Sequence, residues 1–255
     1  MGASLSNSAR GFLAKCVQVV QRHITPDCLL CGAASHGEML CAPCNADMPR
    51  VSRLAHERCV VCALPLAGSD GTQTCGACLA DAPAFDHICA AYAYAFPADA
   101  LVQALKYRGQ LAIAPLLGEA LTRALDAKPD VLVAMPLSNG RLRERGFNQA
   151  HEIARHVARA TGIVLLNDAC RRVLETPPQA ALPYKARAKN VRNAFVCDAN
   201  FDGKHVAIID DVMTTGATLN ELAKKIKRAG AARITGLVAT RTLAYSDLTV
   251  RSSHV

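Results

Sequence analysis

The most informative segment of this sequence is HVAIIDDVMTTGATL, residues 205–219. Its four apolar residues, 206–209, predict a buried strand. Two adjacent carboxylates, Asp210 and Asp211, follow at the C-terminal end of this strand, which is where open α/β sheets bind ligands. The small and hydroxylated residues that come next open a predicted helix: Thr214, Thr215, Gly216, Ala217 and Thr218.

This strand-to-helix turn predicts an anion site. Backbone N–H groups of the turn and the helix N-terminus point to one place, and threonine hydroxyls add further donors. The two acids repel a phosphate, so sugar hydroxyls or a magnesium ion are their expected partners. Two acids that only cap a turn are the structural alternative, which the adjoining TTGAT disfavours.

Around this stretch, short apolar runs alternate with helical periods, which predicts a parallel α/β sheet. The expected strands are residues 88–95, 131–135, 163–166, 205–209 and 234–240. The expected helices are one that ends near Tyr107, one that carries Leu116 to Leu125, and residues 149–161 and 217–229. Asn148 is a candidate cap of the helix 149–161, and Gly146 is expected to adopt a backbone angle that other residues resist.

Eight of the twelve cysteines form four C-x-x-C pairs within residues 28–78. Each pair points two thiolates at one point, which is half of a tetrahedral zinc site. The candidate ligands are Cys28, Cys31, Cys41, Cys44, Cys59, Cys62, Cys75 and Cys78. The short gaps between consecutive C-x-x-C pairs favour two zinc ribbons, each made from neighbouring pairs. Spacing alone also allows an interleaved arrangement, in which alternate pairs share a zinc ion. Both sites have four cysteines and no open position, so the two zinc ions are expected to be structural.

The other cysteines are expected to be small core residues, because each lies alone in apolar surroundings: Cys16, Cys89, Cys170 and Cys197. No apolar run is long enough to cross a membrane, and Arg10, Lys15 and Arg22 interrupt any secretory signal. The chain is therefore expected to be cytoplasmic, with reduced thiols that bind metal rather than form disulfides.

The net charge of +8 is unevenly distributed. The cysteine-rich segment, residues 27–81, carries six acids against three arginines. The segment from Arg141 to Arg192 holds eleven bases against four acids, which suits pyrophosphate or nucleic acid as well as an ordinary solvated face. The absence of tryptophan and the few aromatic residues argue against a stacking platform for single-stranded nucleic acid.

Residues 206–218 resemble the phosphoribosyl pyrophosphate signature of type I phosphoribosyltransferases. With the cysteine pairs, residues 28–241 resemble the ComF family of double-zinc-ribbon phosphoribosyltransferases. The resemblance implies a parallel-sheet type I phosphoribosyltransferase domain preceded by a double zinc ribbon. It also implies that Asp210 and Asp211 are the catalytic residues, which hold the ribose hydroxyls, and that the turn at residues 214–218 binds the 5-phosphate.

Three further stretches match this family: Leu105-Lys106-Tyr107, VLVAMPLSNGRLRERGFN at residues 131–148, and Thr176-Pro177-Pro178-Gln179 with Arg187, Asn190 and Phe195. The second stretch implies a pyrophosphate loop made by Leu137, Ser138, Asn139, Arg141 and Arg145. Ala134 and Met135 stand where the family usually has Pro-Val. Residues 175–193, rich in Pro, Arg and Lys, are the candidate for a mobile hood over the ligand.

These features together predict a protein that binds phosphoribosyl pyrophosphate with Mg²⁺. The expected reaction transfers the phosphoribosyl group to an unknown acceptor and releases pyrophosphate. The resemblance to the family implies a nucleobase as the acceptor. The alternative is a non-catalytic factor in competence-related DNA uptake or nucleic-acid binding that uses this site as a sensor. In that case the acidic zinc module is expected to bind a protein partner, and residues 141–192 are expected to bind DNA weakly.

Four parts of the chain are expected. They are an amphipathic N-terminal helix at 1–26, a double zinc ribbon at 27–82, a phosphoribosyltransferase-like domain at 83–245 and a tail at 246–255.

Overall fold

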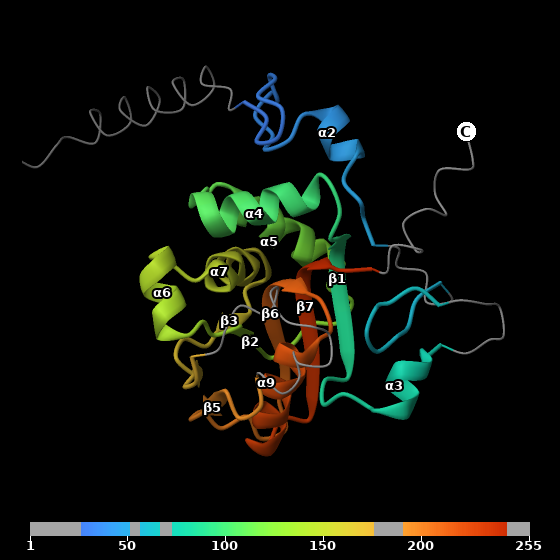
Figure 1. Cartoon of the computed structure of the whole chain (residues 1–255), viewed down its shortest axis with the longest axis vertical. Helices are drawn as coiled ribbons and strands as arrows, with labels where there is room; N and C mark the ends of the chain where they lie inside the picture. The colour runs from blue at the N-terminus through green and yellow to red at the C-terminus, as the bar shows by residue number, and fades with distance from the viewer. Residues whose placement is uncertain (1–26, 52–56, 67–72, 176–190, 244–255) are drawn as a thin grey trace, which may run out of the picture. The chain divides into compact units, whose positions relative to one another are not determined.

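The computed structural model describes residues 27–51, 57–66, 73–175 and 191–243 (Figure 1). The chain divides into two compact units, Met1–Met48 and Pro49–Val255. The expected N-terminal helix, the C-terminal tail and residues 176–190 of the expected hood lie outside the described residues. The boundaries expected after residues 26, 82 and 245 stay predictions.

The second unit is built on a five-stranded sheet in which all neighbouring strands are parallel. In sheet order the strands are β1 (His87–Ala93), β7 (Arg233–Arg241), β6 (His205–Met213), β2 (Val131–Ala134) and β3 (Val164–Leu165). The predicted parallel α/β sheet is confirmed. Strand β6 is longer than residues 205–209, because residues 210–213 continue to pair with β7.

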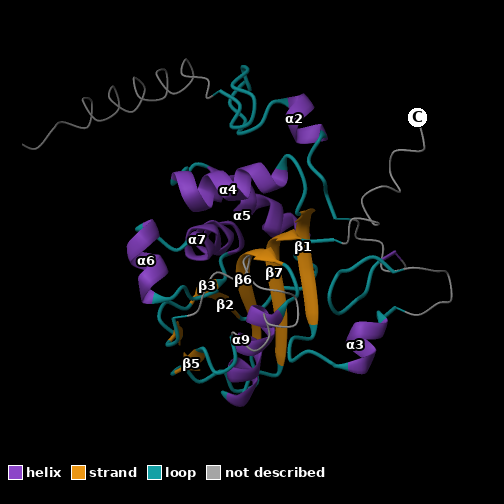
Figure 2. Ribbon diagram, viewed as in Figure 1, coloured by secondary structure: helices purple, strands orange, loops and turns teal. Residues whose placement is uncertain are grey.

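Helices cover both faces of this sheet, as Figure 2 shows. On one face, α5 (Ile113–Ala124) contacts β1 and β7, and α7 (Gln149–Thr161) contacts β2 and β6. Helix α4 (Ala98–Arg108) packs on α5, and α9 (Ala217–Arg228) packs on the opposite face. Among the described residues, no helix is long and apolar enough to span a bilayer.

Local sequence signals explain where α7 begins and what precedes it. The Asn148 side chain accepts hydrogen bonds from the backbone N–H groups of Ala150 and His151, so its expected capping role is confirmed. Gly146 has φ of 77° at the end of the short helix α6 (Asn139–Arg145), which confirms the expected unusual backbone angle. The formation of α6 leaves only a short loop, residues 135–138, between β2 and that helix.

The second cysteine cluster belongs to the core of the sheet unit. Helix α3 (Gly76–Ala80) carries Cys78, and Cys59 and Cys62 are 2% and 6% exposed. Both pack in one hydrophobic cluster with sheet residues such as Ile88 and Val238 and with α9. In contrast, the first cluster, with the short helix α2 (Ala42–Ala46), lies in the other unit.

Cys170 and Cys197 form a disulfide across the antiparallel pair β4 (Cys170–Arg172) and β5 (Phe195–Cys197). Two expectations are therefore wrong: that both are isolated core residues, and that no thiol of the chain forms a disulfide. The two cysteines are register partners across the two strands although 27 residues separate them, which spacing alone does not reveal. Cys89 is buried as expected, but its thiol also contacts the Asp126 carboxylate. Cys16 lies outside the described residues.

Candidate active site and zinc clusters

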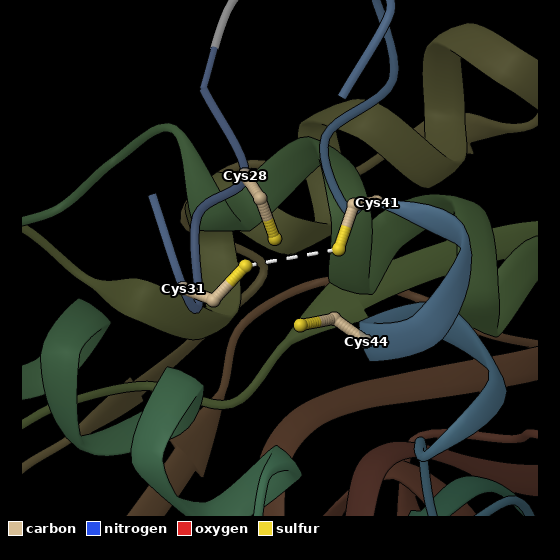
Figure 3. A group of neighbouring side chains, drawn as sticks. All are labelled: Cys28, Cys31, Cys41 and Cys44. Carbon is tan, nitrogen blue, oxygen red and sulfur yellow. Dashed lines mark hydrogen bonds between the residues drawn. The ribbon is translucent and has the colours of Figure 1, made fainter. Parts of the chain in front are cut away.

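The first cysteine cluster brings four sulfur atoms together, as Figure 3 shows for Cys28, Cys31, Cys41 and Cys44. All four sulfurs lie within 4.8 Å of one another, and the Cys31 and Cys41 sulfurs are 3.7 Å apart. Zn–S bonds of about 2.3 Å in a tetrahedron place sulfurs about 3.8 Å apart. The cluster therefore matches a tetrahedral zinc site.

The second cluster has the same arrangement, with Cys59, Cys62, Cys75 and Cys78 within the same 4.8 Å limit. Here the sulfurs of Cys62 and Cys75 are 3.6 Å apart. In both clusters the second C-x-x-C pair spans the start of a short helix, α2 or α3. Each pair joins its neighbour, so the consecutive arrangement is confirmed and the interleaved one is excluded.

The electrostatics of the thiols also favour a bound cation. Burial opposes ionisation of Cys28 and Cys59, but backbone N–H groups outweigh it and lower their pKa values to about 6 and about 7. In the same clusters, burial and the charge of Cys59 raise the pKa of Cys62 to about 11. Hydrogen bonding with Cys41 similarly raises the pKa of Cys44. Cys28 and Cys59 therefore form thiolates readily, whereas Cys44 and Cys62 need a metal ion beside them to ionise.

The predicted acids lie at the C-terminal part of β6. Asp211 is 3% exposed, and its Oδ2 lies 2.8 Å from the ammonium of Lys106 on α4. Burial and then the charge of Asp211 raise the pKa of Asp210 well above its usual range, and Lys106 opposes this shift. Burial lowers the pKa of Lys106, but the charges of Asp211 and Asp210 outweigh it and raise it. The ammonium therefore balances the acid pair.

The turn after β6 has the backbone that its sequence predicts. Gly216 directly precedes α9 with φ of 81°, a conformation that favours glycine, and an added Cβ there lies only 2.6 Å from Met213 Cε. The Thr215 hydroxyl accepts a hydrogen bond from the Ala217 N–H at 3.2 Å. Thr214, Thr215, Ala217 and Thr218 are only partly buried, so this turn is open to a ligand.

A buried arginine stabilises the turn through hydrogen bonds to its backbone carbonyl groups. Arg241, at the end of β7, is 2% exposed and donates to the carbonyl groups of Met213 and Thr214. It also donates to the Cys62 carbonyl at 3.0 Å. One guanidinium therefore ties the second zinc cluster to the predicted phosphate turn.

The predicted pyrophosphate loop binds a carboxylate of this same chain. The carboxylate of Glu175 accepts hydrogen bonds from the Gly140 N–H at 2.6 Å and from the Ser138 hydroxyl at 3.2 Å. Burial and then the charge of Arg141 lower the pKa of Arg172, while Glu175 and Asp210 act in the opposite sense. The charges of Arg141, Glu175 and Asp210 therefore all act on the Arg172 guanidinium.

Other residues of this loop have separate roles. Arg145 stacks on the Tyr107 ring at 5.3 Å and donates to the Gln149 side chain at 3.0 Å. Leu137 and Asn139 line a pocket of about 220 Å³ that is also bordered by residues 170–172, and neither acid of β6 lines this pocket. Thr176, Gln179, Arg187 and Asn190 lie outside the described residues, whereas Phe195 is fully buried on β5.

Sequence reasoning missed the roles of three residues. Lys106 stands in a segment that resembles the ComF family, but only the packing of α4 shows that it pairs with Asp211. Nothing in the sequence points to Glu175 as a ligand of the loop, or to Arg241 as the link between turn and zinc cluster.

Fold and cysteine clusters define a double zinc ribbon protein with a parallel-sheet α/β domain, which is the predicted fold class. The family model of the double zinc ribbon domain matches residues 20–79. DNA utilization protein YhgH of Escherichia coli K12 is 32% identical over 212 residues, which are 80% of this chain and 91% of that protein. Competence protein F of Haemophilus influenzae is 35% identical over 163 residues, 60% of this chain and 71% of that protein. The chain belongs to the family of these proteins, the ComF family.

Solved structures with similarity include phosphoribosyltransferases. A hypoxanthine phosphoribosyltransferase from Staphylococcus aureus aligns over 51% of this chain and 62% of its own, with 15% identity and a TM-score of 0.30. An adenine phosphoribosyltransferase from Thermoanaerobacter pseudethanolicus aligns over 52% and 83%, with 19% identity and a TM-score of 0.33.

Proposed function

We propose that this protein binds phosphoribosyl pyrophosphate with Mg²⁺ and transfers the phosphoribosyl group to an acceptor, with release of pyrophosphate. The observation that carries the proposal is the position of Asp210 and Asp211. They lie in the C-terminal part of the central parallel strand β6, which ends at Met213 shortly before the turn at Gly216. The acids that would bind the ribose hydroxyls therefore lie next to the N–H donors that would bind the 5-phosphate. The ribose and the 5-phosphate are neighbours in the ligand in the same way.

The occupied pyrophosphate loop supports the other half of the ligand. Glu175 places two carboxylate oxygens on donors of Ser138 and Gly140, which is how a diphosphate oxygen is bound by a loop of this kind. Arg141 and Arg172 supply positive charge beside it. A diphosphate carries more charge than one carboxylate, so we expect it to displace Glu175 from the loop.

The residues fit a role for Mg²⁺, because paired carboxylates are the oxygen ligands that this ion prefers. When bound with the diphosphate, Mg²⁺ neutralises part of the leaving-group charge. The protein's own part is to hold the ribose hydroxyls with Asp210 and Asp211 and to clamp both phosphate ends. The C1 carbon then develops oxocarbenium character in a fixed environment, and no covalent nucleophile is needed.

The proposal predicts that exchanging both Asp210 and Asp211 for asparagine weakens Mg²⁺-dependent binding of phosphoribosyl pyrophosphate. We expect at least a tenfold loss, or about 1.4 kcal/mol, because both ribose hydroxyls lose a charged acceptor. Isothermal calorimetry measures the affinity. Urea unfolding of the same samples measures the destabilisation expected when the Lys106 ammonium loses its buried partner Asp211, so that binding is compared only under conditions where both proteins are folded. The control is Asp81→Asn with Asp202→Asn, which makes the same charge change on two exposed acids that do not line the pocket beside the predicted pyrophosphate loop. Unchanged affinity in the first variant rules out this site.

The names of the relatives favour a second function, because they refer to competence and to DNA utilization. We propose that nucleic acid binds weakly to the basic residues near the pyrophosphate loop, among them Arg141, Arg143 and Arg145. The acidic zinc module is a poor binder of DNA phosphates and suits a protein partner. The eight zinc-ligand thiols must stay reduced to bind metal, which supports a cytoplasmic location, whereas the Cys170–Cys197 disulfide by itself is more typical of an oxidising compartment.

A DNA titration at two salt concentrations tests this second function. DNA affinity is expected to fall steeply with salt, by about 0.9 log units per phosphate contact for each tenfold increase. Exchanging Arg141, Arg143 and Arg145 for glutamine should weaken binding, and phosphoribosyl pyrophosphate with Mg²⁺ should displace the DNA from the same surface. Tight DNA binding that survives saturating ligand contradicts a shared surface and puts DNA recognition elsewhere on the chain.

A further inference from the structure

Three side chains with metal-binding atoms meet at the edge of the sheet. His87 and Cys89 lie two residues apart on the edge strand β1 and therefore point to the same face. Asp126 follows α5, the helix that covers that face. The Asp126 carboxylate lies 2.9 Å from His87 Nε2 and 3.4 Å from the Cys89 sulfur. One nitrogen, one sulfur and one oxygen atom thus lie within 4.8 Å of one another.

The hydrogen bond on the other side of the imidazole determines what His87 presents to this cluster. His87 Nδ1 contacts the backbone carbonyl of Val60, and a carbonyl can only accept, so Nδ1 carries a hydrogen. In the neutral ring, Nε2 then has a lone pair that faces the Asp126 carboxylate. Two acceptors at 2.9 Å repel each other unless a proton or a metal ion lies between them. A metal-bound histidine typically has this arrangement, with its other nitrogen donating to a carbonyl.

We propose that His87, Cys89 and Asp126 form a third metal site, which takes a Zn²⁺-like divalent transition-metal ion. Tetrahedral bonds of about 2.0–2.3 Å place ligand atoms about 3.3–3.8 Å apart, so only small side-chain adjustments are needed. Three protein ligands leave a fourth position for water or another ligand. The site therefore differs in kind from the two closed four-cysteine clusters, and it binds its ion more weakly.

This cluster is separate from the proposed phosphoribosyl site. His87 begins β1, whereas Asp210 and Asp211 lie toward the C-terminal end of the parallel strand β6. Because the strands are parallel, the two sites lie toward opposite ends of the strands. Asp126 is half exposed and also lines a pocket of about 340 Å³, so an ion has access from solvent.

Cobalt titration of the full chain, already loaded with two zinc ions, tests the proposal. Added Co²⁺ is expected to bind at one further equivalent and to give a thiolate-to-cobalt charge-transfer band, because Cys89 supplies the sulfur. Metal analysis after gel filtration verifies that the two zinc ions stay in place. We expect Asp126→Asn to weaken Co²⁺ binding at least tenfold and Cys89→Ser to abolish the charge-transfer band. The control Asp198→Asn removes an exposed acid and should leave the titration unchanged.

Three results overturn the proposal. They are the absence of a third equivalent, a charge-transfer band that persists in Cys89→Ser, and unchanged Co²⁺ affinity in Asp126→Asn. Any of them leaves the cluster as a hydrogen-bonded group in which a proton occupies the position between His87 and Asp126. Because Asp126 is half exposed, its variant is expected to fold even if loss of the buried Cys89 thiol disturbs the core.

Discussion

Exchanging Cys59 for serine is expected to release one zinc ion and to destabilise the whole sheet unit. The exchange of Cys28 should release the other zinc ion and leave the sheet unit almost unchanged. Both variants lose one ligand of a four-cysteine cluster, so they are chemically matched. The difference arises because Cys59 belongs to the hydrophobic core of the sheet unit, whereas Cys28 lies in the separate unit Met1–Met48.

The size of the Cys59 effect follows from what the metal supports. Structural zinc contributes about 10 kcal/mol or more to the folding of small zinc domains. The second cluster holds Cys59 and Cys62 against sheet and α9 residues, and the Cys62 carbonyl accepts from Arg241. If only a third of the metal's contribution reaches the sheet unit, its melting temperature falls by roughly 10 °C.

Thermal unfolding followed by circular dichroism, with zinc analysis of the same samples, measures both variants. Hydrogen exchange of β6 and β7 separates local from global loss, because these central strands open only when the sheet unit unfolds. Equal melting temperatures for Cys59→Ser and Cys28→Ser contradict a shared core. Retention of both zinc ions in either variant contradicts its assigned cluster.

Exchange of Arg241 for methionine is the second change with a large expected effect. The loss should be about 3–5 kcal/mol in the free energy of unfolding, because three carbonyl groups lose their donor and each unsatisfied buried acceptor costs about 1–3 kcal/mol. Methionine fills similar space but cannot donate to the carbonyl groups of Cys62, Met213 and Thr214, which then lack these donors in a buried place. The affinity for phosphoribosyl pyrophosphate should fall as well, because the turn before Gly216 loses its support.

The matched control is Arg233→Met, which removes the same charge from the exposed first residue of the same strand. Urea unfolding gives the free energies, and calorimetry gives the ligand affinity. A loss of less than about 1 kcal/mol in Arg241→Met, the level of ordinary surface substitutions, contradicts a bracing role for the guanidinium.

Much of the fold could be predicted because its signals are local. The helix 149–161 is confirmed at both ends, since Asn148 caps its start and Gly162 ends it with φ of 70°. The strand that starts at residue 205 is confirmed by its buried apolar run, whereas its extension to Met213 depends on pairing with β7. The disulfide of Cys170 and Cys197 escaped prediction, because it joins two strands that only the folded chain places side by side.

Local sequence patterns predict both kinds of site: four cysteine pairs predict the zinc clusters, and an acid pair followed by a glycine turn predicts the proposed phosphoribosyl site. These features are short-range, so spacing and local backbone preference carry them. The packing of helices and strands sets which distant groups lie beside these features, such as Lys106 beside Asp211, Glu175 on the predicted pyrophosphate loop and Arg241 beside the turn. These partners lie between 27 and 179 residues apart, and their pairing depends on how helices and strands pack, which no local pattern encodes.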